Sequence, residues 1–440
     1  MMNGKTKRRT IVVASSSRRT GLRFSAHSKL EPLAYLFVLV FIFTIPFEKM
    51  LEIDGIGTIS KLAGAPLLGL WALVLILKPR FRKVTAFHGF CLLYVAICGF
   101  SYFWSLSAEN TGILFRIYVQ LYLLILFMWF GLNTERRCVQ ALFAYLIGSW
   151  VVVLLIYYNF AAGNVGEWSG RTSIANADAN ETALVLTMGM PVGWYLATRI
   201  GMPGVRHLLF KLVCFSYLPA AVVAVVMTGS RGGVLSALPS VLYMLGSIAK
   251  MRLRAKVVVV AVVVTLVIVL LPYLPEQQIE RISTTVNSLE SGELSSREDF
   301  WRLAISIWQA DSKNSLVGIG AASFPSQNIG EYVVHSTHLS ILVETGILGF
   351  SAYICILLVL IRLCWRSPQR YFMLCLLCSW GIGASALTWE YRKPTWVIWS
   401  LLVCMAYMGN QVQMRRRKKL RRNKRRRMRK RSGLVDASVR

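Results

Sequence analysis

The fold is decided most clearly by residues 257–271, which read VVVVAVVVTLVIVLL. Eleven of the fifteen residues in this stretch are β-branched, a composition that favours a buried strand in a water-soluble protein. In lipid, an isolated strand would leave its backbone N–H and C=O groups without partners, whereas a helix pairs them within the segment. If the stretch lies in a bilayer it is therefore helical, and the remainder of the chain indicates whether it does.

Long apolar runs recur along nearly the whole chain. The 440 residues are 55% hydrophobic, with a mean hydropathy of +0.53, and a helix of about 20 apolar residues crosses the roughly 30 Å hydrocarbon core. We predict an all-α polytopic membrane protein with about twelve transmembrane helices and a large outward-facing loop that contains short helices. The predicted helices cover residues 32–48, 60–78, 86–105, 112–132, 138–158, 181–199, 207–228, 232–249, 256–273, 337–362, 371–389 and 394–410.

The net charge of +30 arises from 50 Lys and Arg against 20 Asp and Glu. Alone, this balance would suggest a nucleic-acid partner. However, most of the basic residues fall at the two ends and in alternate connections, which is the positive-inside pattern of a membrane protein. We therefore expect both termini in the cytoplasm and no nucleic-acid partner. The basic run 415–431 could bind anionic headgroups, bind nucleic acid or fix topology, and its juxtamembrane position favours anchoring and topology.

Two outward-facing segments, 159–180 and 274–334, are longer than a turn requires. Within the second, two sets of apolar residues recur at helical spacing. They are Ile279, Ile282, Val286 and Leu289, followed by Phe300, Leu303, Ala304, Ile307 and Trp308. Ser295 with Glu298 predicts a capping box for the second helix. We expect two amphipathic helices over the mouth of the bundle, with the chain turning at residues 318–320.

Several cationic side chains are predicted to face the same outer side of the bundle. They are Arg171, Arg231, Arg297, Arg302, His335, His338, Arg392 and Lys393. A lone cation at membrane depth is costly, so converging cations require an anion. The carboxylates that could pair some of them are Glu181, Glu298, Asp299 and Glu390. A lipid diphosphate would satisfy the rest, because guanidinium groups bind phosphate bidentately and stay charged. Alternatively, each arginine is an ordinary interfacial residue whose head reaches toward water.

His335 stands at the predicted start of the tenth helix. A neutral imidazole there could accept a proton from an attacking hydroxyl. His338 lies one turn further and could share a metal, but no carboxylate or thiol completes such a site by spacing, so no metal is expected. Glu344 lies within the helix, where an ionised carboxylate is expensive, and a structural role is favoured over a catalytic one. No P-loop or nucleophile-elbow motif is present, which argues against an NTPase or α/β-hydrolase.

Two motifs carry a resemblance to a known family. The pattern His335-Ser336, nine residues, Gly346, two residues, Gly349 resembles the signature of the bacterial O-antigen ligase and polymerase superfamily. Residues 228–233, TGSRGG, are similar to the Ser-Arg-Gly motif of that family, and residues 176–183 resemble its Asn-rich helix start. Twelve helices with one large loop before the histidine also match. The resemblance covers the chain from about residue 160 to about residue 410. The first four helices and the basic tail match only in general character.

The resemblance implies a metal-independent, inverting glycosyltransferase of the GT-C-like kind that uses no cofactor. Its donor would be an undecaprenyl-diphosphate-linked glycan, and its active site would lie on the periplasmic face of the bacterial inner membrane, among membrane lipids. Arg231 would bind the diphosphate and His335 would activate or orient the acceptor hydroxyl. Arg171 and Arg297 would add to diphosphate binding. Possible accessory residues are Arg302, His338, Arg392, Lys393 and Glu344.

Four functions are compatible with these expectations. The first is an O-antigen ligase that transfers the glycan to a lipid A core sugar, and the second is an O-antigen or exopolysaccharide polymerase with a growing glycan as acceptor. The others are a protein O-oligosaccharyltransferase and a glycolipid transporter, whose expected internal repeat is not visible. The chain would comprise a basic cytoplasmic tail (1–31), nine transmembrane helices (32–273), a periplasmic loop (274–334), three more helices (335–410) and a polybasic cytoplasmic tail (411–440).

Overall fold

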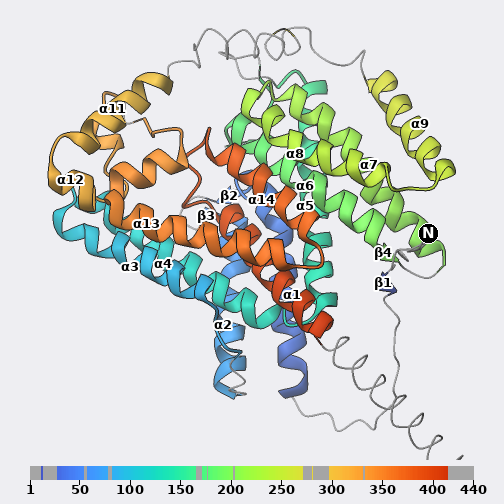
Figure 1. Cartoon of the computed structure of the whole chain (residues 1–440), viewed down its shortest axis with the longest axis horizontal. Helices are drawn as coiled ribbons and strands as arrows, with labels where there is room; N and C mark the ends of the chain where they lie inside the picture. Colours follow the sequence, from blue (N-terminus) through green and yellow to red (C-terminus); the bar gives the residue numbers. More distant parts are fainter. Residues whose placement is uncertain are drawn as a thin grey trace, which may run out of the picture.

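The computed structural model describes residues 11–12, 27–53, 57–77, 82–164, 171–175, 177–201, 204–270, 280, 297–330 and 332–414. These residues are predominantly helical. The strands among them are two residues long and form two small pairs, Ile11–Val12 with Ile200–Gly201 and Glu52–Ile53 with Gly57–Thr58. The predicted all-α class is confirmed (Figure 1).

Each predicted membrane helix has a counterpart in the structure. The helices are α1 (His27–Thr44), α2 (Ile59–Leu77), α3 (Ala86–Phe100), α4 (Ala108–Gly131), α5 (Glu135–Ala161), α6 (Ala179–Arg199), α7 (Val205–Met227), α8 (Arg231–Ile248), α9 (Leu253–Leu270), α13 (Thr337–Arg366), α14 (Arg370–Ala384) and residues 393–414. Residues 257–270 of the β-branched stretch lie in α9 and are helical. Among the described residues, seven helices are long and apolar enough to cross a membrane, so the total of twelve crossings stays a prediction.

The predicted second amphipathic helix of the large loop is confirmed. It is α11 (Arg297–Gln309), which buries Ala304, and it is followed by a short helix that was not predicted, α12 (Ser312–Val317). The chain then turns as expected, with left-handed φ angles of 75° at Gly318 and 103° at Gly320. The predicted first amphipathic helix and the Ser295 cap lie outside the described residues, apart from Glu280.

α6 occupies the centre of the bundle. It packs against α5, α7, α8 and α14, and every residue from Thr182 to Ala197 is buried. A helix that is buried on all sides can be apolar all round, which explains why it carries no polar stripe. Because α6 is enclosed, its first turn is held firmly beside the ends of its neighbours.

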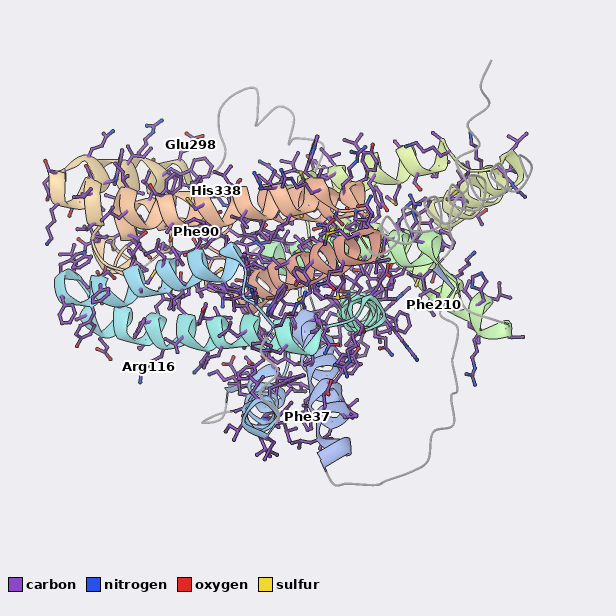
Figure 2. The ribbon with its side chains drawn as sticks, turned by 60° about the horizontal axis from the view of Figure 1, so that its bottom comes forward. Phe37, Phe90, Arg116, Phe210, Glu298 and His338 are labelled. Carbon is purple, nitrogen blue, oxygen red and sulfur yellow. The ribbon has the colours of Figure 1, made fainter. Side chains whose placement is uncertain are left out.

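The helices of the large loop lie on α13. α11 and α12 both contact α13, which in turn packs on α3, and α3 packs on α4. Figure 2 shows this stack from the side, with Glu298 of α11 above His338 of α13 and Arg116 of α4 on the opposite face. The loop thus covers the N-terminal part of the helix that follows His335.

Candidate functional site

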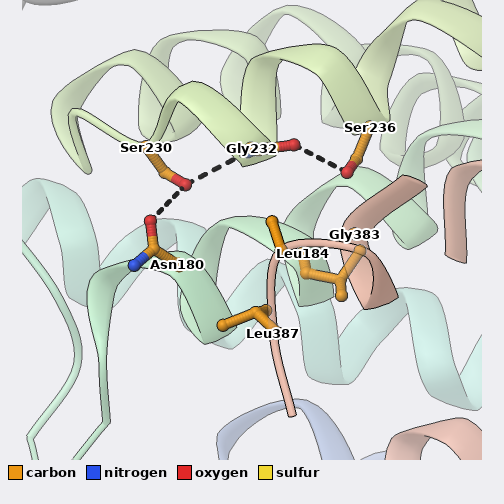
Figure 3. Close-up of a pocket in the computed structure, with 9 residues that line it drawn as sticks. Asn180, Leu184, Ser230, Gly232, Ser236, Gly383 and Leu387 are labelled. Atoms are coloured by element: carbon orange, nitrogen blue, oxygen red, sulfur yellow. Dashed lines mark hydrogen bonds between the residues drawn. The ribbon is translucent and has the colours of Figure 1, made fainter. Parts of the chain in front are cut away.

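Arg171 belongs to a hydrogen-bonded cluster that includes the residue before Arg231. The Nε of Arg171 donates to the carbonyl of Thr228 (2.9 Å), and its Nη2 donates to Oδ1 of Asn180 (2.8 Å). The hydroxyl of Ser230 donates to the same Oδ1 (2.8 Å; Figure 3). Ser230 is the N-cap of α8, and Arg231 is the first residue of that helix. The connection before α6 and the turn before α8 are therefore joined through one amide.

The glycines after Arg231 allow α8 to lie against α6. A Cβ at Gly233 would stand 2.5 Å from the Cβ of Ala183, so the two helices approach more closely than a side chain permits. A small crevice remains between α6, α8 and the end of α14 (Figure 3). It is lined by Asn180, Leu184, Ser230, Gly232, Gly233, Ser236, Gly383, Ala386 and Leu387. The close packing places the start of α8, with Arg231, beside the first turn of α6.

His335 lies immediately before α13 and is half-buried. Burial, and then the positive charge of Arg297, lower the pKa of its imidazole below the ordinary value of 6.5, and Asp178 opposes this shift. Asp178 is the N-cap of α6, two residues before Asn180. The charges of Arg297 and of Asp178, at the N-terminus of α6, therefore both act on His335, and its neutral form is favoured near pH 7.

The first turn of α13 is held by the connection that follows α14. The hydroxyl of Thr337 donates to the carbonyl of Leu387 (2.7 Å) and accepts from the backbone N–H of Trp389 (2.8 Å). Ser340 donates to Oε1 of Glu390 (3.1 Å), and burial raises the pKa of that carboxyl to about 7. These contacts hold the start of the helix, and with it the position of His335.

Arg392 and Lys393 form ion pairs with carboxylates. Arg392 pairs with Glu181 of α6 at 2.9 Å, and Lys49 pairs with the other oxygen of the same carboxylate. Lys393 pairs with Glu48 at 2.6 Å. These bonds connect the α1–α2 connection, the first turn of α6 and the segment after α14, so their evident role is to hold these segments together.

The remaining predicted residues lie in different surroundings. Arg297 begins α11 and is half-buried, whereas Arg302 is 80% exposed and pairs with Glu298 one turn away at 3.8 Å. His338 lies within α13, where its Nδ1 is 2.9 Å from the hydroxyl of Tyr353. The structure thus places Arg171 and Arg231 beside the first turn of α6 and sets Arg297 close enough to His335 for its charge to act on the imidazole, whereas Arg302 and His338 have partners within their own helices.

Glu344 and Gly346 hold the large loop onto α13. Gly346 has a φ of 62° and interrupts the helix, and the carbonyls of Val343 and Glu344 accept backbone N–H groups of Ile319 (3.1 Å) and Gly320 (3.0 Å). The carboxylate of Glu344 accepts two further N–H groups of the same segment, at residues 322 and 324. The Gly-x-x-Gly motif therefore marks the place where the loop docks.

Sequence reasoning did not single out Asn180 and Asp178. Both lie in the Asn-rich segment that was noted only as a motif, and Asp178 accepts from the N–H of Asn180 (2.8 Å) as it caps α6. An Asp before an apolar run is a helix-start signal, and that signal could have placed both residues at a helix N-terminus. Their contact with Arg171 and Ser230 depends on tertiary packing and has no sequence signal.

Comparison with known proteins supports the resemblance drawn from the motifs. A family described as O-antigen ligase matches residues 217–354, a range that runs from α7 into α13 and includes Arg231, His335 and both glycines of the Gly-x-x-Gly motif. The resemblance to the O-antigen ligase and polymerase superfamily is confirmed over this part of the chain. The search of curated proteins found no match. The family match and the apolar helices together support an integral membrane protein of ligase- or polymerase-like glycosyltransferase type, with lipid-linked glycans as substrates.

Proposed function

We propose that this protein is an O-antigen ligase, which transfers a glycan from undecaprenyl diphosphate to a lipid A core sugar at the periplasmic face of the inner membrane. One observation carries the proposal. Arg171, Asn180 and Ser230 form a hydrogen-bonded cluster at the start of α6, next to Arg231 at the start of α8. Two residues after the half-buried His335, Thr337 donates to the carbonyl of Leu387, which lines the same crevice as Asn180 and Ser230. Glycosyl transfer from such a donor requires two groups: a cation that binds the diphosphate and a neutral base that accepts a proton from the acceptor hydroxyl.

The arginine cluster suits a diphosphate. Arg171 and Arg231 supply permanently charged, planar donors that match phosphate oxygens. The N-termini of α6 and α8 lie at the same place and add their positive partial charge. In this proposal the guanidinium groups, rather than a divalent cation, balance the charge that develops on the departing diphosphate.

His335 would act on the acceptor. The acceptor hydroxyl attacks the anomeric carbon of the donor glycan from the side opposite the diphosphate, and its proton passes to the neutral imidazole. The bond from the anomeric carbon to the diphosphate oxygen breaks, and its electron pair leaves with the lipid diphosphate, so the anomeric configuration inverts. The lipid diphosphate is itself the leaving group, and no nucleotide is needed on this face.

The backbone of His335 supports a functional role. Its φ is 54°, in the left-handed region that residues other than glycine rarely adopt. Such conformations cost of order 1–3 kcal/mol and persist where the surrounding structure holds them, often at active sites. Here the contacts of Thr337 with the segment after α14 hold the backbone just beyond His335.

A gene deletion separates the ligase from the polymerase that would use the same donor. Loss of a ligase removes all O-antigen from the lipid A core on a lipopolysaccharide gel, whereas loss of a polymerase leaves one repeat attached. The deletion strain is then complemented with wild type, His335→Ala, Arg231→Ala and Arg116→Ala. Arg116 is an exposed cation of α4 on the opposite face of the stack (Figure 2) and serves as the matched control.

We expect wild type and Arg116→Ala to restore the O-antigen ladder and the other two variants to fail at equal protein abundance. A ladder restored by both His335→Ala and Arg231→Ala would refute the proposal and favour a binding-only transporter. The membrane orientation is tested by labelling single cysteines introduced beside His335 and in the polybasic tail. The proposal requires the two labels to fall on opposite sides of the membrane.

A further inference from the structure

Two aromatic rings of the large loop form a chain of contacts that ends at His335. The ring of Phe300, in α11, has its centroid 5.3 Å from that of Tyr332 and 6.3 Å from that of the His335 imidazole. The planes are tilted by 45° and 57°. Neither ring has a part in the diphosphate site or in the proton transfer described above, so their place next to the histidine needs another explanation.

Tyr332 is exposed, yet its backbone is fixed. The side chain of Asn328 accepts from the N–H of Tyr332 (2.8 Å) and donates to its carbonyl (2.9 Å). The same amide donates to the carbonyl of Phe324 (3.2 Å), and Phe324 is fully buried. One half-buried amide, itself bonded to the backbone of a buried residue, thus holds both backbone groups of a residue that is 53% exposed.

The absence of a side chain at Gly330 leaves room for the ring of Tyr332. Gly330 has a φ of 90°, and a Cβ at that position would stand 2.6 Å from Cε2 of the Tyr332 ring. Glycine is therefore the residue that permits both this backbone conformation and this ring position. On the other side, Nε1 of Trp301 donates to the carbonyl of Val334 (3.1 Å), which fixes the chain between Tyr332 and His335.

We infer that Phe300 and Tyr332 form a stacking platform for a sugar ring of the glycan substrate. This inference rests on the proposed function, because that reaction requires a sugar within reach of His335. The apolar C–H face of a pyranose packs on an aromatic ring, and the tyrosine hydroxyl offers a polar tip at the edge of the same surface. Holding an exposed ring in one orientation has an entropic cost that a preorganised binding surface recovers when its ligand binds.

The saccharide could belong to the donor glycan or to the acceptor, and kinetics distinguish them. The full-length protein in liposomes is assayed with undecaprenyl-diphosphate-linked O-antigen as donor and O-antigen-free lipopolysaccharide as acceptor. The variants are Tyr332→Ala, Tyr332→Phe, Phe300→Ala and the control Tyr158→Ala, which removes a tyrosine of α5 that is 66% exposed. Melting temperatures confirm that each variant is folded.

We expect Tyr332→Ala to raise KM for one of the two substrates about tenfold, the effect of losing about 1.4 kcal/mol of binding free energy. Phe300→Ala should raise the same KM, and Tyr332→Phe and Tyr158→Ala should resemble wild type. A higher donor KM assigns the platform to the donor glycan, and a higher acceptor KM assigns it to the acceptor sugar. Unchanged values of both KM in Tyr332→Ala would overturn the inference.

A direct binding measurement keeps this inference separate from the proposed function. Saturation-transfer NMR measures whether a lipid-free O-antigen oligosaccharide binds to the wild-type protein and whether it binds to Tyr332→Ala. Binding that is seen in wild type and lost in Tyr332→Ala supports the platform. This holds even if the wild-type protein transfers no glycan, a result that would refute the proposed function but not the platform. If the wild-type protein transfers glycan and Tyr332→Ala keeps full binding and both KM values, the platform is refuted and the proposed function stands.

Discussion

Arg171 and Ser230 donate hydrogen bonds to the same oxygen atom, Oδ1 of Asn180, each at 2.8 Å. The two donors come from different connections, one before α6 and one before α8, and each connection carries an arginine of the candidate site. Asn180 is thus a positioning residue that connects both halves of the proposed diphosphate site. Its loss would leave each connection without its bond to α6.

Asn180→Ala should lower kcat/KM for glycan transfer by about 10- to 100-fold, because it removes one charged and one neutral hydrogen bond that orient the site. The matched control is Asn133→Ala. Asn133 also accepts from an arginine, Arg137, at 3.3 Å. It lies before the first residue of α5, whereas the connection with Arg171 follows the last residue of that helix. Equal activity of the two variants in the liposome assay would contradict the positioning role.

The acid limb of the pH–rate profile should report His335. Burial and the charge of Arg297 lower the pKa of the imidazole, so the active neutral form persists below pH 6.5 and activity falls as pH drops through that lowered pKa. Arg297→Gln removes the cation and should move the limb toward higher pH, whatever it does to the maximal rate. A limb that stays in place or moves toward lower pH would show that another group controls the profile.

The carboxylate of Glu181 should contribute to stability, because it pairs with both Lys49 and Arg392 and is only 12% exposed. Glu181→Gln leaves two partly buried cations without their counter-charge, at a cost of about 1–3 kcal/mol. We expect the melting temperature in detergent to fall by a few degrees. Arg302→Gln breaks an ion pair whose arginine is 80% exposed and should change it little. Equal melting temperatures for the two variants would argue against the Glu181 network.

Gly330→Ala should reproduce the loss of sugar binding expected for Tyr332→Ala, because the new methyl group would occupy the position of the ring. The backbone strain of a left-handed alanine must be separated from this displacement. Gly163→Ala provides the control, since Gly163 has a φ of 70° and no atom within 4 Å of its added Cβ. If both variants bind the oligosaccharide equally well, the ring position is not what matters.

Glu344→Ala should loosen the large loop rather than abolish chemistry directly. It leaves the N–H groups of the half-buried Ala322 and the buried Phe324 unpaired, at about 1–3 kcal/mol for the buried one and less for the other. Faster cleavage of the loop by a protease added to the liposomes would measure this. Glu344→Gln keeps an acceptor oxygen and should give an intermediate cleavage rate. Glu344→Gln could instead be as inactive as His335→Ala while its loop resists protease as well as the wild-type loop does. That result would favour a catalytic carboxyl.

The amphipathic loop helix and the motif residues show where sequence reasoning succeeded. Apolar spacing predicted α11 and the helix after His335, because periodicity is a local property that the chain carries in any context. The same reasoning read the cations of the outer face as one group. In the structure Arg392 pairs with Glu181, one of the carboxylates named as a candidate partner, and Lys393 pairs with Glu48, which was not named; both partners are more than 200 residues away.

By itself, the sequence determined that the chain is a bundle of apolar helices and which side chains could hold a diphosphate or take a proton. Both follow from local composition, since a single apolar segment in lipid pairs its backbone groups only as a helix and a guanidinium keeps its charge everywhere. Only the tertiary structure decided that Asn180 joins Arg171 to Ser230, that Glu344 holds the loop, and that Phe300 lies between Tyr332 and His335. Those relationships come from packing between distant segments, where a contact depends on the position of whole helices rather than on neighbouring residues.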